Sequence, residues 1–190
     1  MSLRAIFGLM IAACWLVFCL YWLISARSAK PNARNSNYYI QWGIRALLVA
    51  AIIVRLHFGG AAHLFAGRPV SPILGAAGVA LCVLGIALAI WARVYLGRNW
   101  GMPMSRKENP ELVTTGPYWY VRHPIYTGML LAILGSALAT GLLRLAAVDL
   151  FLCAYFVYSA VQEQKIMLKE FPDAYPAYMK RTKMLIPFVL

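Results

Sequence analysis

Long apolar runs, separated by short polar stretches, divide the chain into hydrophobic segments. Ala5–Ile24 contains no charged residue, and at about 1.5 Å per residue it is long enough to cross the roughly 30 Å hydrocarbon core of a bilayer as a helix. Four further segments follow, the first of them less uniform: about Tyr39–Phe58, Ile73–Ile90, Ile125–Leu142 and Leu145–Val161. The pattern predicts an all-α fold, a polytopic membrane helical bundle of about five transmembrane helices.

Composition and charge support a membrane protein. The 190 residues are 62% hydrophobic and 13% charged, whereas soluble domains are about a quarter charged. The net charge of +12 would favour nucleic acid in a soluble protein, but the basic residues here lie mostly between apolar runs, where they meet anionic lipid headgroups. We therefore expect the lipid bilayer as a partner, and no nucleic acid.

The distribution of Lys and Arg predicts the orientation of the bundle, because basic residues favour the cytoplasmic side of a membrane. Of the 18 basic residues, only Arg4, Arg55, Arg68 and Arg144 fall on one side of the predicted layout, and the other fourteen fall opposite them. This places the N-terminus outside, and both the loop before the fourth segment and the C-terminal tail in the cytoplasm. We expect a bacterial-type inner membrane as the host.

Two of the predicted helices carry small residues on one face. These residues are Gly78, Cys82, Gly85 and Ala89 in the third segment, and Gly128, Ala132, Gly135 and Ala139 in the fourth. Such faces let helix backbones approach closely where lipid provides no hydrophobic driving force, so we interpret them as packing surfaces. The third segment closes with Trp91, Arg93 and Tyr95, a pattern typical of the membrane interface.

The cysteines indicate neither a metal site nor a disulfide. Cys14, Cys19, Cys82 and Cys153 all lie in apolar runs, and no two of them form a CxxC pair. Cysteines of this kind are usually small buried apolar residues. Because the three histidines do not cluster with them, we predict no metal.

Residues suited to chemistry gather in the second half of the chain. We interpret residues 1–190 as a single membrane domain, in which three spans in residues 1–91 precede a catalytic half in residues 92–190. In that half, Arg122 and His123 directly precede Pro124, which suits the first turn of a helix. A helix N-terminus beside an arginine favours an anion. A basic, aromatic membrane anchor is the other interpretation of this stretch.

The tail contains a carboxylate that could contact a ligand and a segment that could close over the bundle. Glu163, at the cytoplasmic end of the fifth segment, is one of six acidic residues and the first carboxylate that a cationic ligand would meet there. Taken alone, it also fits an ordinary interfacial charge paired with Lys or Arg. Residues 166–181 are first amphipathic and then aromatic and interrupted by proline, so they are suited to lie over the mouth of the bundle as a lid.

Two blocks of this half form one extended pattern. Leu112–Gly128 reads Leu-Val-x-x-Gly-x-Tyr-x-x-x-Arg-His-Pro-x-Tyr-x-Gly, and Glu163 follows after a gap that fits one helical hairpin. Phe171, Tyr175, Tyr178 and Pro187 continue the second block. The combined pattern covers roughly the C-terminal half and resembles the isoprenylcysteine carboxyl methyltransferase family and its phospholipid-methyltransferase relatives.

The resemblance implies a membrane methyltransferase. Its cofactor, S-adenosylmethionine, would be enclosed by the loop and the tail, and a lipid-like or small apolar substrate would enter from the bilayer. The catalytic residues would be His123, Arg122 and Glu163. The positions that match cofactor contacts of the family are Leu112, Val113, Tyr118, Arg122, His123, Pro124 and Glu163, and the candidate site adds the rings of Tyr126, Tyr175 and Tyr178.

Two departures from the family pattern bear on the substrate. The carboxyl methyltransferases have a basic residue one helical turn before the glutamate, where this chain has Ser159, and Gln164 replaces a frequent second acid. The acceptor therefore stays open between a prenylcysteine carboxylate, another lipid and a small apolar nucleophile. An amine or thiol would need a proton acceptor, for which His123 is the natural choice.

Ser159 and Asp149 are both candidates for contact with the substrate. Asp149 lies inside the fifth segment, and acids within membrane spans are rare and often functional. Arg144, about one turn away, could pair with it.

Two other functions remain open. A membrane reductase of the steroid-reductase type resembles this group in its C-terminal helices, but the phosphates of its nicotinamide cofactor would call for more clustered Lys and Arg. A non-catalytic membrane subunit or small transporter would place polar residues near the midplane of its spans, and the sequence offers almost none beyond Asp149. The sequence leaves the oligomeric state open.

Overall fold

The computed structural model describes residues 2–28, 30, 71–101, 109–141 and 146–186, and within them the regular structure is helical. The α-helices are α1 (Leu3–Ala26), α4 (Pro72–Leu96), α5 (Pro124–Thr140), α6 (Ala146–Glu170) and α7 (Ala174–Arg181). Two short 3₁₀ helices, η1 (Gly97–Asn99) and η2 (Gly116–Trp119), lie between α4 and α5. The all-α prediction is confirmed for this part of the chain, and the predicted segment Tyr39–Phe58 lies outside it.

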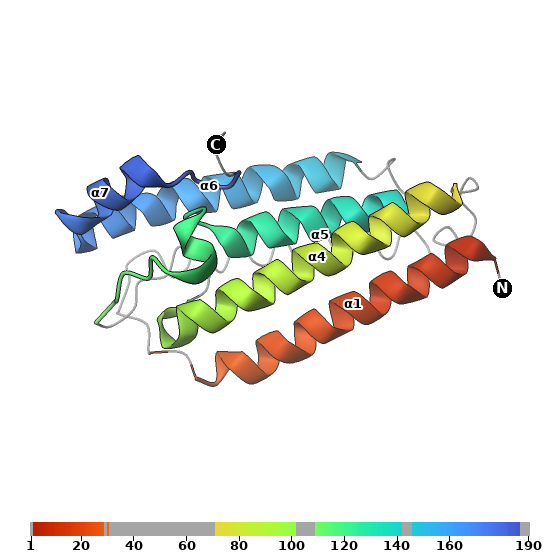
Figure 1. The fold of residues 1–190 in the computed structure, drawn as a ribbon, viewed down its shortest axis with the longest axis horizontal. Helices are drawn as coiled ribbons and strands as arrows, with labels where there is room; N and C mark the ends of the chain where they lie inside the picture. The colour runs from red at the N-terminus through yellow and green to blue at the C-terminus, as the bar shows by residue number, and fades with distance from the viewer. Residues whose placement is uncertain (1, 29, 31–70, 102–108, 142–145, 187–190) are drawn as a thin grey trace.

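The four long helices α1, α4, α5 and α6 lie along one another in the bundle (Figure 1). The C-terminal ends of α1, α4 and α6 meet the N-terminal end of α5 at one end of the molecule, where η2 and α7 also lie (Figure 1). We call this end the loop end. It brings the polar loop and the tail together, as the layout of hydrophobic segments predicts.

Close contact between α4 and α5 forms the centre of the bundle. A Cβ atom added at Gly85 would lie 2.5 Å from the carbonyl oxygen of Gly128, and one added at Gly135 would lie 2.5 Å from the backbone nitrogen of Cys82. These distances are far below van der Waals contact, so no residue larger than glycine fits without moving a backbone. The interpretation of the two small-residue faces as packing surfaces is confirmed, and the structure shows that they pack on each other.

Two of the described helical stretches, Leu3–Ala26 and Pro72–Asn99, are long and apolar enough to cross a membrane. Helix α5 is apolar but shorter, with 17 residues. A membrane helical bundle agrees with these lengths, while the count of five spans and the orientation with the N-terminus outside stay predictions.

Several helix boundaries differ from the predicted segments, and two of the differences bear on the site. Helix α5 ends at Thr140 rather than at Leu142, because Gly141 takes a left-handed conformation with φ of 66° and terminates the helix. Helix α6 continues to Glu170, well beyond the predicted end at Val161. Glu163 therefore lies within a helix, and the amphipathic start of the predicted lid is the last part of α6.

Arg93 differs from its expected role at the membrane interface. Its side chain is only 2% exposed and donates hydrogen bonds of 2.6 Å to the carbonyl oxygens of Ser25 and Gly97. Its guanidinium also lies 4.8 Å from the ring centre of Trp100. Because the last carbonyls of a helix lack partners within the helix, Arg93 satisfies the ends of α1 and α4 and joins them.

Candidate functional site

The tail pairs with the segment that precedes α5. Val121 and Lys183 form an isolated parallel bridge, and the backbone N–H groups of Arg122 and His123 donate to the carbonyl oxygens of Lys183 and Met184 at 2.8 and 3.0 Å. One turn into α5, the hydroxyl of Thr127 donates to the carbonyl of Leu185 at 2.6 Å. The tail thus fixes the first turn of α5 and the side chains that it carries.

Three side chains at this junction form a compact polar group, which we call the His123 cluster: His123, Tyr126 and Glu163. The Tyr126 hydroxyl donates to Glu163 Oε1 at 2.5 Å, and His123 Nδ1 lies 3.4 Å from Glu163 Oε2. The rings of His123 and Tyr126 stack with 5.6 Å between centroids and 6° between planes. The structure therefore brings together three of the predicted site residues, which come from α6 and from the start of α5.

Two buried polar atoms, His123 Nε2 in this cluster and Ser159 Oγ one turn before Glu163, have no hydrogen-bond partner among the described residues. Ser159 is completely buried and lies one turn before Glu163 on α6, on the same helix face. Leaving a buried polar atom unsatisfied costs about 1–3 kcal/mol. Atoms of this kind are commonly satisfied by a ligand or by ordered water.

Arg122 joins α6 to the end of α7. Its Nε donates to Gln164 Oε1 at 3.1 Å, and its Nη1 donates to the carbonyl oxygens of Met179, at 3.3 Å, and of Thr182. The C-terminal carbonyls of a helix carry partial negative charge, which a guanidinium complements. Within the described part of the chain Arg122 Nη2 makes no hydrogen bond, so the predicted contact between Arg122 and a ligand anion stays a prediction for that atom.

Buried tyrosines connect α7 to η2. The Tyr178 hydroxyl donates to the Tyr118 carbonyl at 2.6 Å, and the rings of Tyr175 and Tyr178 meet edge to face at 5.8 Å. Burial raises the pKa of Tyr178 to about 12 and raises the pKa values of Tyr118 and Tyr175 further above their usual value. These phenols are therefore neutral near pH 7 and offer rings and hydroxyl groups rather than charge.

The other predicted site residues lie at varying distances from the cluster. Pro124 is fully buried at the start of α5, as predicted. Leu112 and Val113 are half-buried in the segment before η2, and their contact with a cofactor stays a prediction. Asp149 lies in the first turn of α6, about 21 Å from Glu163 along the helix, so the structure does not bring it to the cluster. Arg144, its predicted partner, lies outside the described residues.

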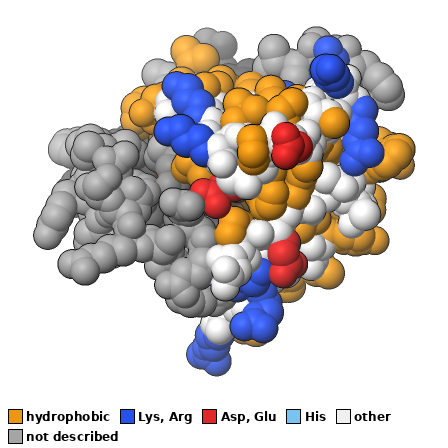
Figure 2. All heavy atoms as spheres, turned by 90° about the vertical axis from the view of Figure 1, so that its left-hand side faces the viewer, with side chains coloured by type: hydrophobic (Ala, Val, Ile, Leu, Met, Phe, Trp, Pro, Cys, Tyr) orange, Lys and Arg blue, Asp and Glu red, His pale blue; other side chains and the backbone are white. Residues whose placement is uncertain are grey.

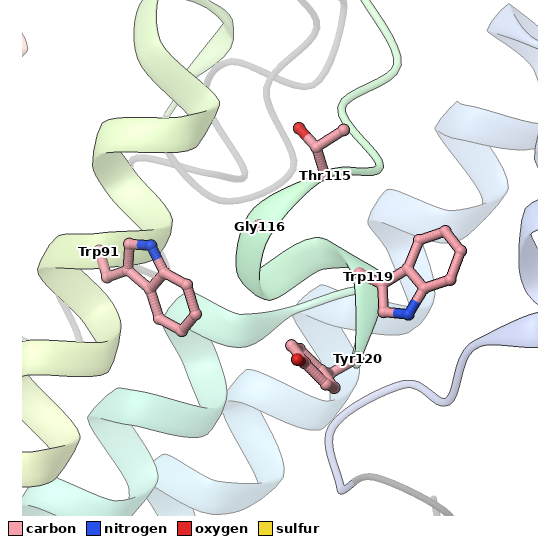
Figure 3. Close-up of a pocket in the computed structure, with 5 residues that line it drawn as sticks. All are labelled: Trp91, Thr115, Gly116, Trp119 and Tyr120. Atoms are coloured by element: carbon pink, nitrogen blue, oxygen red, sulfur yellow. The ribbon is translucent and has the colours of Figure 1, made fainter.

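An open pocket of 320 Å³, which we call the aromatic pocket, lies between α4 and η2 (Figure 3). It is lined by Trp91, Thr115, Gly116, Trp119 and Tyr120. Gly116 has a φ of 60°, and a Cβ there would lie 2.5 Å from the ring of Tyr95, so the turn requires glycine. The sequence analysis did not identify this pocket, because Trp91 is far from η2 in sequence; the Gly-Pro turn with its neighbouring aromatics was the available signal.

Comparisons with known proteins identify relatives of the chain. A profile of the phospholipid methyltransferase family matches residues 73–174, which include the loop motif and Glu163. Curated relatives include the cobalt-zinc-cadmium resistance protein CzcN of Cupriavidus metallidurans, 34% identical over 76% of this chain and 62% of its own length. Another is the protein-S-isoprenylcysteine O-methyltransferase of Schizosaccharomyces pombe, 32% identical over 57% of this chain and 47% of its own length. The matched part of the chain thus covers about half to three fifths of the length of these relatives.

Proposed function

We propose that this chain, which belongs to the phospholipid methyltransferase family, is an S-adenosylmethionine-dependent methyltransferase with its site at the His123 cluster. The observation that carries the proposal is the state of His123. Its Nδ1 faces a carboxylate, while its buried Nε2 has no partner among the described residues. A group held in this way at the junction of loop and tail has the geometry of a binding or catalytic site.

The residues around the cluster fit the chemical groups of the cofactor. S-adenosylmethionine has a carboxylate, an ammonium, a sulfonium and an adenine ring. Glu163 supplies a negative charge for the cationic groups, Arg122 Nη2 supplies a donor for the carboxylate, and the neutral rings of Tyr118, Tyr175 and Tyr178 suit the adenine. When bound, the cofactor supplies a methyl group on a positively charged sulfur, which a nucleophile can displace.

His123 is arranged to accept a proton at Nε2. If Nδ1 carries the proton and faces Glu163 Oε2, at 3.4 Å, then Nε2 carries the lone pair. We assign this tautomer from the hydrogen-bonding geometry. Tyr126 holds the other carboxylate oxygen and so fixes the carboxylate against His123. An amine or thiol acceptor would lose its proton to Nε2, whereas a carboxylate acceptor would need no base.

We propose a lipid-like or small apolar molecule as the acceptor. The exposed apolar surfaces of α1 and α4 favour a substrate that arrives through the bilayer. Ser159 offers a hydroxyl, and no positive charge, one turn before Glu163. This favours an uncharged reacting group over a carboxylate such as that of isoprenylcysteine, which the name of the S. pombe relative indicates as its substrate.

Calorimetric binding of S-adenosylmethionine and its demethylated product to detergent-purified protein tests the proposal, with a nicotinamide dinucleotide as the control ligand. We expect the first two ligands to bind. We expect His123→Ala and Glu163→Gln each to weaken binding about tenfold or more, as for the loss of a charge-assisted hydrogen bond. Glu170→Gln, which neutralises another carboxylate of α6, should leave binding unchanged.

The other outcomes identify the alternatives. Binding of the dinucleotide alone would favour a membrane reductase, and binding of none of the ligands would favour a non-catalytic membrane subunit. Equal cofactor affinity in Glu163→Gln and Glu170→Gln would show that the site is not at the His123 cluster.

A further inference from the structure

The η2 segment separates two different environments. Tyr118 is buried, and its carbonyl receives the hydrogen bond from Tyr178 of α7. The next two residues, Trp119 and Tyr120, are each 58% exposed and line the aromatic pocket with Trp91 of α4 (Figure 3). The pocket therefore lies beside the cofactor site proposed above and shares none of its lining residues with the His123 cluster.

With α4 placed across a bilayer, the aromatic pocket would lie at the depth of the membrane interface. The apolar stretch Ile73–Ile90 of α4 spans about 27 Å as a helix, close to the thickness of the hydrocarbon core. Trp91 comes directly after it and is 45% exposed. Trp and Tyr side chains concentrate at this level of a bilayer because their rings are apolar while their N–H and O–H groups remain hydrated.

A cation stands beside the pocket. The Arg181 guanidinium lies 4.8 Å from the ring centre of Trp119 and 5.4 Å from that of Tyr178. Within the described residues no carboxylate pairs with it, and none of the residues that line the pocket is acidic. A guanidinium that lies over an aromatic ring still has several N–H groups with which to bind an anion. Lys180 and Lys183 are exposed nearby in sequence, and Lys and Arg side chains mark this end of the molecule (Figure 2).

We propose that the aromatic pocket and Arg181 bind one anionic phospholipid of the surrounding bilayer. Its phosphate accepts hydrogen bonds from Arg181, and its glycerol and first chain carbons pack against Trp91, Trp119 and Tyr120. An aromatic pocket next to a cation that pairs with no carboxylate of the described residues matches a molecule with an apolar body and an anionic head. This lipid is distinct from the methyl acceptor, and it supports the contact through which Arg181 joins α7 to η2.

Tryptophan quenching in nanodiscs tests this site. The full chain is placed in two sets of phosphatidylcholine nanodiscs. One set contains a small fraction of brominated phosphatidylglycerol, and the other contains the same fraction of brominated phosphatidylcholine. In both lipids the bromine atoms lie near the headgroup. We expect brominated phosphatidylglycerol to be enriched at the pocket about fivefold over brominated phosphatidylcholine, as for one basic contact at a membrane surface. The chain has six tryptophans, of which Trp91 and Trp119 line the pocket, so Trp91→Phe and Trp119→Phe together identify the part of the quenching that comes from it.

Matched variants separate a specific site from diffuse attraction. Arg181→Gln should remove the preference for phosphatidylglycerol, and Arg181→Lys, which keeps the charge but loses the planar stack, should retain part of it. Lys169→Gln removes one exposed charge from the end of α6 and should leave the preference intact. Equal quenching by the two lipids in the parent protein would overturn the proposal, as would an equal loss in Lys169→Gln and Arg181→Gln. Neither result depends on whether the chain binds S-adenosylmethionine.

Discussion

The α4–α5 interface and the loop end are held together by different means. At the interface, glycine and alanine let two helix backbones touch, and the contact is made of many small van der Waals terms. At the loop end, a few side chains and backbone groups form directed hydrogen bonds between segments far apart in sequence. The α4–α5 interface tolerates no added side-chain volume, whereas the loop end can lose its hydrogen bonds one at a time. Substitutions in the two regions should therefore fail in different ways.

The largest effect should come from added volume at the interface. Gly85→Ala places a Cβ 2.5 Å from a backbone oxygen and 2.6 Å from the backbone nitrogen of Ala132, so α4 and α5 must separate. We expect a loss of about 3 kcal/mol or more in stability, at or beyond the upper end of usual overpacking costs. Thermal unfolding in detergent measures it.

Gly8→Ala is the matched control for this change. Gly8 lies in α1, and no atom comes within 4 Å of a Cβ added there. Because alanine is the better helix former, this variant should be as stable as the parent or slightly more so. Equal midpoints for Gly8→Ala and Gly85→Ala would show that α4 and α5 are not in backbone contact.

A smaller and more local effect should follow from the loss of Arg122. Arg122→Met removes the three hydrogen bonds to Gln164, Met179 and Thr182, and we expect the tail contact to weaken by about 2 kcal/mol while the helices stay folded. Trypsin cleavage after Lys180 and Lys183 should accelerate about tenfold or more. The exposed-arginine variant Arg98→Met should be cleaved like the parent, and unchanged cleavage in Arg122→Met would mean that other bonds hold the tail.

The loss of one hydroxyl within the His123 cluster should affect binding more than stability. Tyr126→Phe keeps the ring stacked on His123 but removes the 2.5 Å hydrogen bond to Glu163. The carboxylate then loses one of its two fixed partners in the cluster, and we expect cofactor affinity to fall about fivefold to tenfold. Calorimetry measures this, with Tyr155→Phe on α6 as the control. A stronger effect in the control would place the binding site elsewhere.

The smallest effect is a pH dependence of the α7–η2 contact. Tyr178 is neutral when it donates to the Tyr118 carbonyl, and its pKa is raised to about 12, chiefly by burial, from about 10 in an unfolded chain. A raised pKa of the folded state means that the stabilisation is complete below about pH 10 and is lost as the pH rises towards 12. Tail protection from protease should fall in this window, and Tyr178→Phe should show a smaller fall.

Sequence reasoning predicted features that depend on local pattern. The small-residue faces of α4 and α5 follow from helical spacing, and the helix start at Pro124 follows from proline geometry. Both are fixed by residues within a few positions of each other, so they can be inferred without knowledge of the fold. The joint placement of His123, Tyr126 and Glu163 rested on a family resemblance, because nothing local specifies which turn of α6 faces α5.

Features that depend on tertiary contact were missed or misjudged. Arg93 was expected only as part of an interfacial pattern, whereas the structure buries its side chain, which donates hydrogen bonds to carbonyl oxygens at the ends of α1 and α4. The partners of Arg122 are mostly backbone carbonyl groups. Every residue has such a group, so the residue types in the sequence do not indicate which of them Arg122 contacts. The role of Asp149 as a substrate-side candidate stays a prediction, since the length of α6 separates it from Glu163 on the same helix. The aromatic pocket requires η2 to lie against the end of α4 that carries Trp91 (Figure 3).

The pairing of Val121–His123 with residues 183–185 also sets an order of assembly. Translation proceeds from the N-terminus, so α1, α4, α5 and α6 leave the ribosome before the tail that completes the first turn of α5. A nascent chain that has formed all these helices still lacks the backbone acceptors that fix His123. The four long helices can therefore pack first, and the contacts that fix His123 form only after residues 183–185 have been made.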